Sequence, residues 1–128
     1  VQGSWSQLSR ALSNLIINAH EASNGKRVSL RCEAITLNEA RRCHLGYLSP
    51  GSYVRIDVED HGPGIPAEYL DRIFEPFFSS KRRGSASGTG LGLSIVAAVV
   101  TDHRGVLDLK TGPDGTLFQL FFPSCEAE

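Results

Sequence analysis

The sequence lacks a long apolar run, so we expect none of it to span a bilayer. It also lacks the basic and then apolar start that is typical of a signal peptide. Neither sign of charge is in excess, because 13 Lys and Arg residues stand against 14 Asp and Glu residues. This balance argues against a general field for nucleic acid or an anionic membrane, and we expect neither as a partner.

Cysteine is scarce as well. The three cysteines, Cys32, Cys43 and Cys125, are odd in number and scattered along the chain. They argue against a disulfide framework and against a zinc site, and they favour a reducing, cytoplasmic environment. The four histidines show no ligand spacing with one another or with the cysteines. We therefore predict no metal site built from these residue types.

What is present fits one domain. A chain of 128 residues with 41% hydrophobic residues can form a single core. No internal repeat and no long linker divides it. We expect residues 1–123 to form the domain and residues 124–128 to be a tail. The abrupt start of a helical pattern leads us to expect a domain taken from a longer protein.

Helical spacing predicts a first helix that starts near Ser4, where Gln7 completes a capping box, and ends at Asn24-Gly25. A second long helix is predicted over residues 92–104, with Gly105 closing it, and a short one over residues 66–74. The first helix carries one apolar stripe, made of Leu8, Leu12, Leu15, Ala19 and Ala22.

Alternation of apolar and polar residues predicts the strands. The stretch 28–34 is expected to be half-buried, and residues 38–51 are expected to be a connector. A mostly antiparallel, mixed sheet with helices on one face makes a two-layer α/β sandwich. The expected strands are 28–34, 54–58, 106–110 and 116–122, the last two joined by a hairpin turn at 112–115.

Asp60 follows the second strand in phase with its apolar residues, so its side chain is expected to point toward the core. A buried carboxylate needs hydrogen-bond donors, and the exocyclic amino group of adenine would be one. The alternative is an ordinary turn aspartate. Gly62 and Gly64 permit unusual backbone angles and leave room for a flat ring, although a plain turn would also use them.

A second glycine cluster, Gly88, Gly90 and Gly92, runs directly into the second long helix. Loop amides followed by a helix N-terminus form a ready anion site, so this cluster favours phosphate binding over a plain hinge. The preceding stretch, residues 79–90, is rich in Ser, Gly and basic residues and is expected to be mobile. Lys81 in this stretch could neutralise phosphates, or could belong to a solvated charge run.

Asn14 and Asn18 lie one turn apart on the first helix, on the same face as Glu21. Asparagine is a mediocre helix residue, so two of them within the helix require a reason. An amide oxygen suits magnesium, which also takes water and phosphate oxygens. Two solvated polar positions are the alternative.

Taken in order, these motifs resemble the ATP-binding catalytic domain of sensor histidine kinases, in particular the nitrogen-regulation and hybrid kinase subgroup. Residues 14–19 resemble its N box, residues 60–65 its first G box, residues 74–78 its F box and residues 88–96 its second G box. The resemblance covers nearly the whole chain. It implies the Bergerat fold, with a mobile ATP lid at residues 79–90.

The resemblance also implies a role for each motif residue. Asp60 would bind the adenine amino group, Asn18 would coordinate Mg²⁺, and Asn14 would support the metal and the phosphates. Lys81 would face the phosphates from the lid, and with Asn14 and Asn18 it would form the catalytic set. The implied ATP-binding residues also include Gly62, Gly64, Ile65, Phe74, Gly88, Thr89, Gly90, Leu91, Gly92 and Leu93.

By resemblance, the reaction is transfer of the ATP γ-phosphoryl group to a histidine on a separate dimerisation domain, with a response regulator downstream. In related ATPases a glutamate that activates water stands where this chain has Asn14, and an amide cannot act as a base. A stand-alone ATPase, an anti-sigma-type serine kinase and a nucleotide-binding pseudokinase are the alternatives. The domain is expected to be cytoplasmic, without direct membrane contact, and monomeric in isolation.

Overall fold

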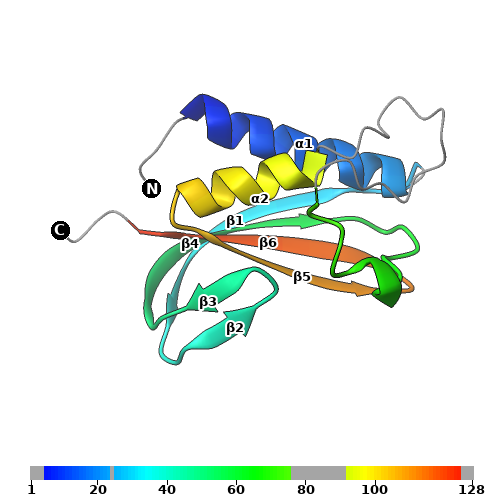
Figure 1. Ribbon diagram of the computed structural model, residues 1–128. Helices are drawn as coiled ribbons and strands as arrows, with labels where there is room; N and C mark the ends of the chain where they lie inside the picture. Colours follow the sequence, from blue (N-terminus) through cyan, green and yellow to red (C-terminus); the bar gives the residue numbers. More distant parts are fainter. Residues whose placement is uncertain (1–4, 24, 76–91, 125–128) are drawn as a thin grey trace.

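The computed structural model describes residues 5–23, 25–75 and 92–124. Within them two helices cover one face of a four-stranded sheet, as the two-layer prediction required (Figure 1). Its strand order is β1-β4-β6-β5, and each described pair is antiparallel. The elements are α1 (Trp5–Ser23), β1 (Ser29–Leu37), β2 (Arg41–Cys43), β3 (Gly46–Leu48), β4 (Gly51–Glu59), a 3₁₀ helix (Ala67–Tyr69), α2 (Gly92–Asp102), β5 (Val106–Gly112) and β6 (Gly115–Pro123).

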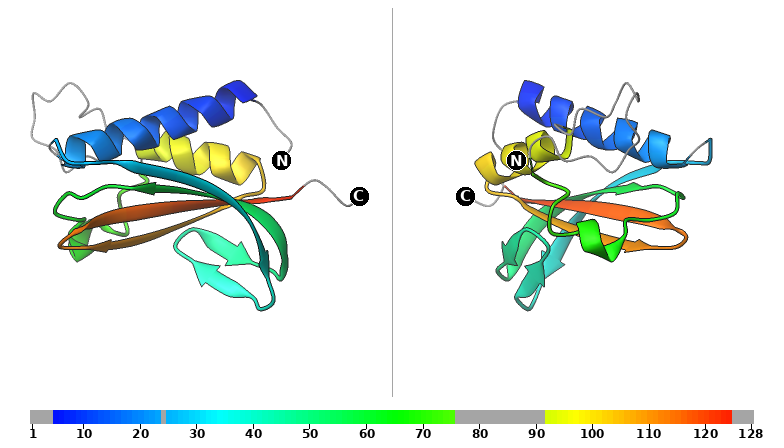
Figure 2. Two further views of the ribbon diagram at one scale, coloured as in Figure 1. Left: turned by 180° about the vertical axis from the view of Figure 1, so that it is seen from behind. Right: turned by 45° about the vertical axis from the view of Figure 1, so that its right-hand side comes forward.

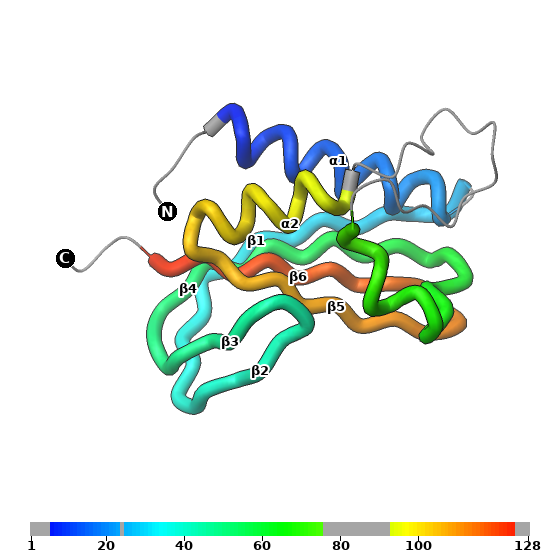
Figure 3. The backbone as a smooth tube through the Cα atoms, viewed as in Figure 1, coloured from blue at the N-terminus to red at the C-terminus, as the bar shows by residue number. Residues whose placement is uncertain are grey.

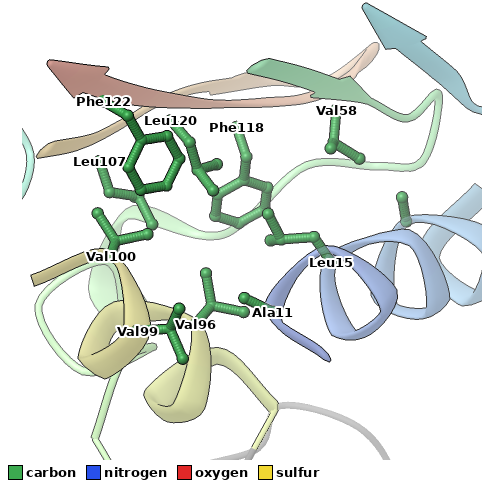
Figure 4. Packing of buried hydrophobic residues seen from close by; sticks show 11 residues of the cluster. Ala11, Leu15, Val58, Val96, Val99, Val100, Leu107, Phe118, Leu120 and Phe122 are labelled. Atoms are coloured by element: carbon green, nitrogen blue, oxygen red, sulfur yellow. The ribbon is translucent and has the colours of Figure 1, made fainter. Parts of the chain in front are cut away.

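The main core lies between the two helices and the sheet (Figure 4). From α1 it takes Ala11, Leu15 and Ala19, which are spaced four apart and therefore share one face. The predicted apolar stripe is thus confirmed at Leu15 and Ala19. Ala22, however, is exposed, and Ala11, which the predicted stripe did not include, is buried. The other buried members are Val58, Val96, Val99, Val100, Leu107, Phe118, Leu120 and Phe122.

The pairing of β4 with β6 brings distant segments to one end of the sheet. Its register runs from Tyr53 opposite Pro123 to Glu59 opposite Leu117. The loop that follows β4 therefore starts beside the turn between β5 and β6. Figure 3 shows the C-terminal end of α1 at this same end of the molecule. Neither described helix is long and apolar enough to cross a membrane.

The expected connector over residues 38–51 is wrong, because this segment forms the hairpin β2–β3 on the sheet face opposite the helices. Its strands have three residues each, too few to show alternation in the sequence. They are stabilised by tertiary contacts, since Cys43 and Leu48 pack with Val106 and Phe121 in a second small core. Leu45 also exchanges backbone hydrogen bonds of 2.9 and 3.2 Å with Leu107 of β5.

Two further predictions need correction. The helix expected over residues 66–74 is only a 3₁₀ turn, because its backbone bonds, such as Tyr69 N–H to the Pro66 carbonyl (2.9 Å), span three residues. So short a segment cannot form a stable helix alone. The strand expected to be half-buried, β1, is exposed from residue 30 to residue 34, because among the described contacts the helices pack over β4 and β5 rather than β1.

A polar network holds the β2–β3 hairpin against the open face of the sheet. The guanidinium of Arg41 lies 2.7 Å from the Asp108 carboxylate and donates to Gln119 at 3.3 Å. It also lies over the ring of Phe121, 5.1 Å from the ring centroid. The backbone N–H of His44 donates to the same Asp108 carboxylate at 3.1 Å. The hairpin therefore depends on β5 and β6 for its place.

Helix α2 does not end as predicted, with Gly105 closing it. The left-handed residue is Arg104, with φ of 62°, and the Gly105 N–H donates to the Val100 carbonyl at 2.8 Å. This is a Schellman end with an arginine where glycine is usual. Gly105 is needed for a different reason, because a Cβ there would lie 2.8 Å from the Phe121 carbonyl oxygen.

We expect Arg104→Gly to raise the free energy of unfolding by about 0.5–1 kcal/mol, because glycine adopts the left-handed conformation without steric cost. Gly105→Ala at the next position should lower it by about 1–3 kcal/mol through overpacking. Urea denaturation of both variants measures the two effects. A stabilised Gly105→Ala variant would contradict the proposed close approach to β6.

Asp108 gives the fold a dependence on pH. Burial opposes its ionisation, but the hydrogen bonds from Arg41, His44 and Leu109 outweigh burial and hold the pKa of Asp108 below its ordinary value. A lowered folded pKa contributes stability above the unfolded value of about 3.9, and this contribution is lost as the pH falls through the folded value.

The stability difference between the parent chain and Asp108→Asn should therefore shrink as the pH falls from 5 toward 3. Thermal unfolding at a series of pH values measures this difference. The stability difference between the parent chain and Arg41→Ala should shrink in the same way as the pH falls, because this change removes the main partner of the Asp108 carboxylate. A difference that stays constant over this range would show that the charge of Asp108 is not what stabilises the hairpin.

Candidate nucleotide site

Asp60 lies just past β4 with its side chain buried, only 5% of the residue being exposed, as the strand phase predicted. Its Oδ1 accepts hydrogen bonds from the backbone N–H of Gly62 (2.9 Å) and of Thr116 (3.2 Å). No described residue donates to its Oδ2. The carboxylate is thus fixed on one oxygen by two segments of backbone, and a carboxylate oxygen can accept further donors.

The loop after Asp60 is attached to the last turn of α1. The backbone N–H of His61 donates to the hydroxyl of Ser23 at 3.1 Å, and Ser23 is fully buried. Gly62 lies so close to α1 that an added Cβ would meet the carbonyl oxygen of Ala22. The space beside Gly62 is therefore taken by the helix, a packing requirement that the sequence did not reveal.

The other end of this loop is attached to the β5–β6 hairpin. Gly64 has φ of +87°, and a Cβ there would meet the carbonyl oxygen of Gly112. The N–H of Ile65 donates to the Thr111 hydroxyl at 2.8 Å, and that hydroxyl lies 2.8 Å from the hydroxyl of Thr116. The turn between β5 and β6 therefore positions the first glycine cluster.

The sequence analysis missed three residues of this support. Thr111 and Thr116 carry the hydroxyl pair, and Gly115 lets β6 approach, since a Cβ there would meet the Asp60 carbonyl oxygen. The signal available was the turn at residues 112–115, which predicted a hairpin but not its contact with Asp60. That contact joins residues 56 positions apart.

Asn14 and Asn18 are both half-buried on α1, with Asn18 one turn before Ala22. Ala22 and Ser23, at the C-terminal end of α1, contact the loop after Asp60. Asn18 lies about one helical turn earlier and is therefore near the same end of α1. Glu21 is exposed. Among the described residues no group of three or more His, Cys, Asp or Glu side chains could hold a metal ion. Any metal here would need amide, water or ligand oxygens.

Three further predicted residues pack against the main core. Ile65, Phe74 and Leu93 are half-buried, and the ring of Phe74 meets Phe118 edge-on with centroids 6.4 Å apart. Gly92 is the first residue of α2. The remaining predicted residues, Lys81, Gly88, Thr89, Gly90 and Leu91, lie outside the described part of the chain, as does the expected lid at residues 79–90.

A hollow of about 830 Å³ lies at the C-terminal end of α1, against the same loop. Asp60, Asn14 and Asn18 do not line it, so it overlaps the predicted site only at Gly62. Its walls are Ala22, Ser23, Lys26, Arg27, His61, Gly62, Pro63, Pro113 and Asp114.

Comparison with known proteins identifies the family of this chain. Residues 3–126 match the family described as histidine kinase-, DNA gyrase B-, and HSP90-like ATPase. The chain is 39% identical over 126 residues to the sensor kinase CckA of Brucella abortus, covering 96% of this chain and 13% of that protein. It is 35% identical over 127 residues to the sensory histidine kinase/phosphatase NtrB of Rhodobacter capsulatus, covering 98% and 34%. The chain thus spans about a third or less of these relatives.

Solved structures agree as well. The mycobacterial sensor histidine kinase MprB aligns with a TM-score of 0.72 and 32% identity, over 94% of this chain and 72% of that one. Full-length ShkA, solved in complex with AMPPNP, aligns with a TM-score of 0.65 and 28% identity, over 91% and 21%. The sandwich of helices on an antiparallel sheet is therefore shared with histidine kinase catalytic domains.

The contact between Gly62 and α1 can be tested directly. Gly62→Ala should lower the free energy of unfolding by about 1–3 kcal/mol, because the new methyl group must displace the backbone of α1. Gly112→Ala is the matched control, since a Cβ at that position meets nothing within 4 Å. Urea denaturation followed by circular dichroism compares the two. Equal stabilities would show that Gly62 has no packing role.

Proposed function

Because the chain belongs to the histidine kinase-, DNA gyrase B- and HSP90-like ATPase family, we propose that it is the part of a sensor histidine kinase that binds ATP and delivers its γ-phosphoryl group. The nucleotide would lie against the loop after β4, between α1 and α2. Two kinds of support favour this: the named sensor kinases it resembles, and the chemistry of the residues at this end of the sheet.

The observation that carries the proposal is the state of the Asp60 carboxylate. A carboxylate in a largely buried residue gains from each further charge-assisted hydrogen bond, and a ligand that supplies an N–H group can provide one. The exocyclic amino group of adenine is such a donor, and it would meet Oδ2 while Oδ1 keeps the Gly62 and Thr116 N–H groups. Gly64 and Ile65, held by Thr111, would line the base.

Magnesium fits the donor set of α1. The amide oxygen of Asn18 is a neutral, hard ligand, and Mg²⁺ takes few protein ligands when phosphate and water oxygens complete its octahedron. Asn14, one turn earlier, would support the metal and the phosphates. When bound, the metal would neutralise the phosphate charge.

The phosphates would meet the start of α2, where Gly92 begins the helix, because the first backbone N–H groups of a helix have no partner within it and favour anions. In this proposal Gly88, Gly90 and Lys81, with Thr89 and Leu91 between the glycines, complete the site from the segment before α2. Leu93 and Phe74 would support it from the core side, since both pack on the main core.

The reaction would move the γ-phosphoryl group to a ring nitrogen of a histidine in a separate dimerisation domain, leaving ADP. The chain's part is positioning and charge stabilisation. Asn14 cannot act as a base, so activation of water is disfavoured relative to an incoming histidine. A response regulator would then receive the group, and the chain would act in the cytoplasm. The chain spans 13% and 34% of two sensor kinases that it resembles, so the proposed partners would lie outside it.

Replacing Asp60 by asparagine tests the adenine contact. Asp60→Asn should weaken ATP binding by roughly tenfold to a hundredfold, because one charge-assisted hydrogen bond is worth about 1.5–3 kcal/mol. Asp71→Asn is a matched control at an exposed position. Isothermal titration calorimetry measures both. Unchanged affinity in a folded Asp60→Asn variant would remove the adenine assignment.

The deciding experiment mixes this chain, Mg²⁺ and γ-labelled ATP with the histidine-containing domain of the same kinase. We expect an acid-labile, base-stable phosphohistidine on that domain, no label on this chain, and slow hydrolysis without the partner. Asn18→Ala should abolish transfer and weaken ATP binding more with magnesium than without it. Rapid hydrolysis without the partner would identify an ATPase instead, and tight binding without transfer would identify a pseudokinase.

A further inference from the structure

Residues 66–75 follow the loop that is proposed to bind adenine, and they form little regular structure. They include a 3₁₀ helix of only three residues, Ala67–Tyr69. Backbone hydrogen bonds such as that from the Leu70 N–H to the Ala67 carbonyl (3.2 Å) run within the segment. So short a stretch is not stable alone, and contacts with other elements must hold it in place. The right view of Figure 2 shows this segment, in green, in front of β5.

His44, in the turn of the β2–β3 hairpin, contacts segment 66–75 at two points. Its Nε2 lies 3.1 Å from the carbonyl oxygen of Leu70, and because a carbonyl oxygen only accepts, Nε2 carries the proton of this bond. Its ring lies 5.6 Å from the ring of Phe74, measured between centroids. Phe74 in turn meets Phe118 of the main core edge-on. One side chain thus contacts both the backbone and an aromatic side chain of the segment.

His44 is itself held by β5. Its backbone N–H donates to Oδ1 of Asp108 at 3.1 Å, while Arg41 of the same hairpin lies 2.7 Å from Oδ2. The next residue, Leu45, exchanges two backbone hydrogen bonds with Leu107. Because these bonds fix the backbone on both sides of the imidazole, the ring meets segment 66–75 from a fixed position.

Strand β5 also holds the residue that precedes the segment. The hydroxyl of Thr111 accepts the N–H of Ile65 at 2.8 Å. Asp108 and Thr111 lie about 10 Å apart along β5. The same strand therefore holds this part of the chain twice, directly at Ile65 and through His44 at Leu70 and Phe74.

We propose that His44 is a positioning residue of the nucleotide site, which clamps segment 66–75 to β5 and so sets the place of Phe74. The inference rests on the proposed function, in which Phe74 supports the nucleotide from the core side. His44 acts through Leu70 and Phe74 and touches no reacting atom. A segment that is already ordered pays less conformational entropy when a ligand binds, so the clamp favours ATP binding. The β2–β3 hairpin thereby takes part in the nucleotide site from outside it.

Hydrogen exchange tests the clamp without any ligand. His44→Ala removes both contacts, so the amides of Leu70, Arg72 and Glu75 should exchange about tenfold faster through local opening. The amide of Leu107 should keep its protection, because its bond to Leu45 does not involve the imidazole. Tyr47→Ala is the matched control, since Tyr47 lies on the same hairpin and is 61% exposed. Unchanged exchange of residues 70–75 in His44→Ala would overturn the clamp.

Two conservative variants separate the contacts and leave the hairpin less disturbed. His44→Gln keeps an N–H donor for the Leu70 carbonyl and loses the ring, whereas His44→Phe keeps the ring and loses the donor. Each should give exchange rates between those of the parent chain and those of His44→Ala. Rates as fast as those of His44→Ala in both variants would overturn the assignment of these two contacts.

ATP binding and turnover test the positioning role. His44→Ala should weaken ATP binding by about threefold to tenfold, the equivalent of one neutral hydrogen bond, and Tyr47→Ala should leave it unchanged. With the histidine-containing domain of the same kinase, KM for ATP should rise by the same factor while kcat stays constant, because the clamp acts on binding. A lowered kcat at unchanged KM, or unchanged affinity, would overturn the inference. A parent chain that binds no ATP would instead overturn the proposed function, and hydrogen exchange would still decide the clamp.

A double-mutant cycle tests whether His44 acts through Phe74. Phe74→Leu alone, His44→Ala alone and the double variant are compared by isothermal titration calorimetry with ATP. Because the two rings are in contact, the loss of affinity in the double variant should be smaller than the product of the two single losses. Losses that simply multiply would overturn the proposed route through Phe74.

Discussion

The Asp60 carboxylate is the point at which three separate parts of this chain meet. Its Oδ1 accepts the N–H of Gly62 in its own loop and the N–H of Thr116 in β6, so it fixes the loop against the sheet. The next residue along the loop, His61, bonds to Ser23 and so ties the same loop to α1. A change at this carboxylate would therefore disturb the loop, the hairpin and the helix together.

Close backbone approach is the second constraint, and it follows from the first. Gly62 admits the carbonyl of Ala22, Gly64 admits that of Gly112, and Gly115 admits that of Asp60 itself. A side chain at any of the three would force two segments apart. Glycine is thus needed here for packing between elements as well as for backbone freedom, which explains why the loop after β4 can be rigid without regular secondary structure.

The two faces of the sheet are used in different ways. One face is covered by α1 and α2 over the main core. The other face carries polar residues such as Asp108 and Gln119 beside the second small core around Phe121, and both hold the β2–β3 hairpin. His44 of that hairpin also lies 3.1 Å from the Leu70 carbonyl and next to the ring of Phe74. The hairpin therefore contacts the segment that leads away from the proposed nucleotide site. Strand β1 packs Ile35 and Leu37 against the second small core, whereas its residues 30–34 are exposed.

The sequence by itself determined the elements with strong periodicity. Alternation located β4, β5 and β6, helical spacing located α1 and α2, and strand phase placed the Asp60 side chain inward, because these patterns depend on neighbours within one or two turns or pleats. The motif order also identified the family before any geometry was known.

Only the tertiary structure decided the rest. The hairpin β2–β3, the exposure of β1, the 3₁₀ turn at Ala67–Tyr69 and the two backbone donors of Asp60 were not evident in the sequence. The β2–β3 hairpin and the donors of Asp60 depend on contacts between segments that are distant in sequence. The exposure of β1 and the shortness of the 3₁₀ turn depend on the lack of such contacts among the described residues. Local residue patterns carry no information about such contacts, and so they could predict a carboxylate that needs donors without saying which segments supply them.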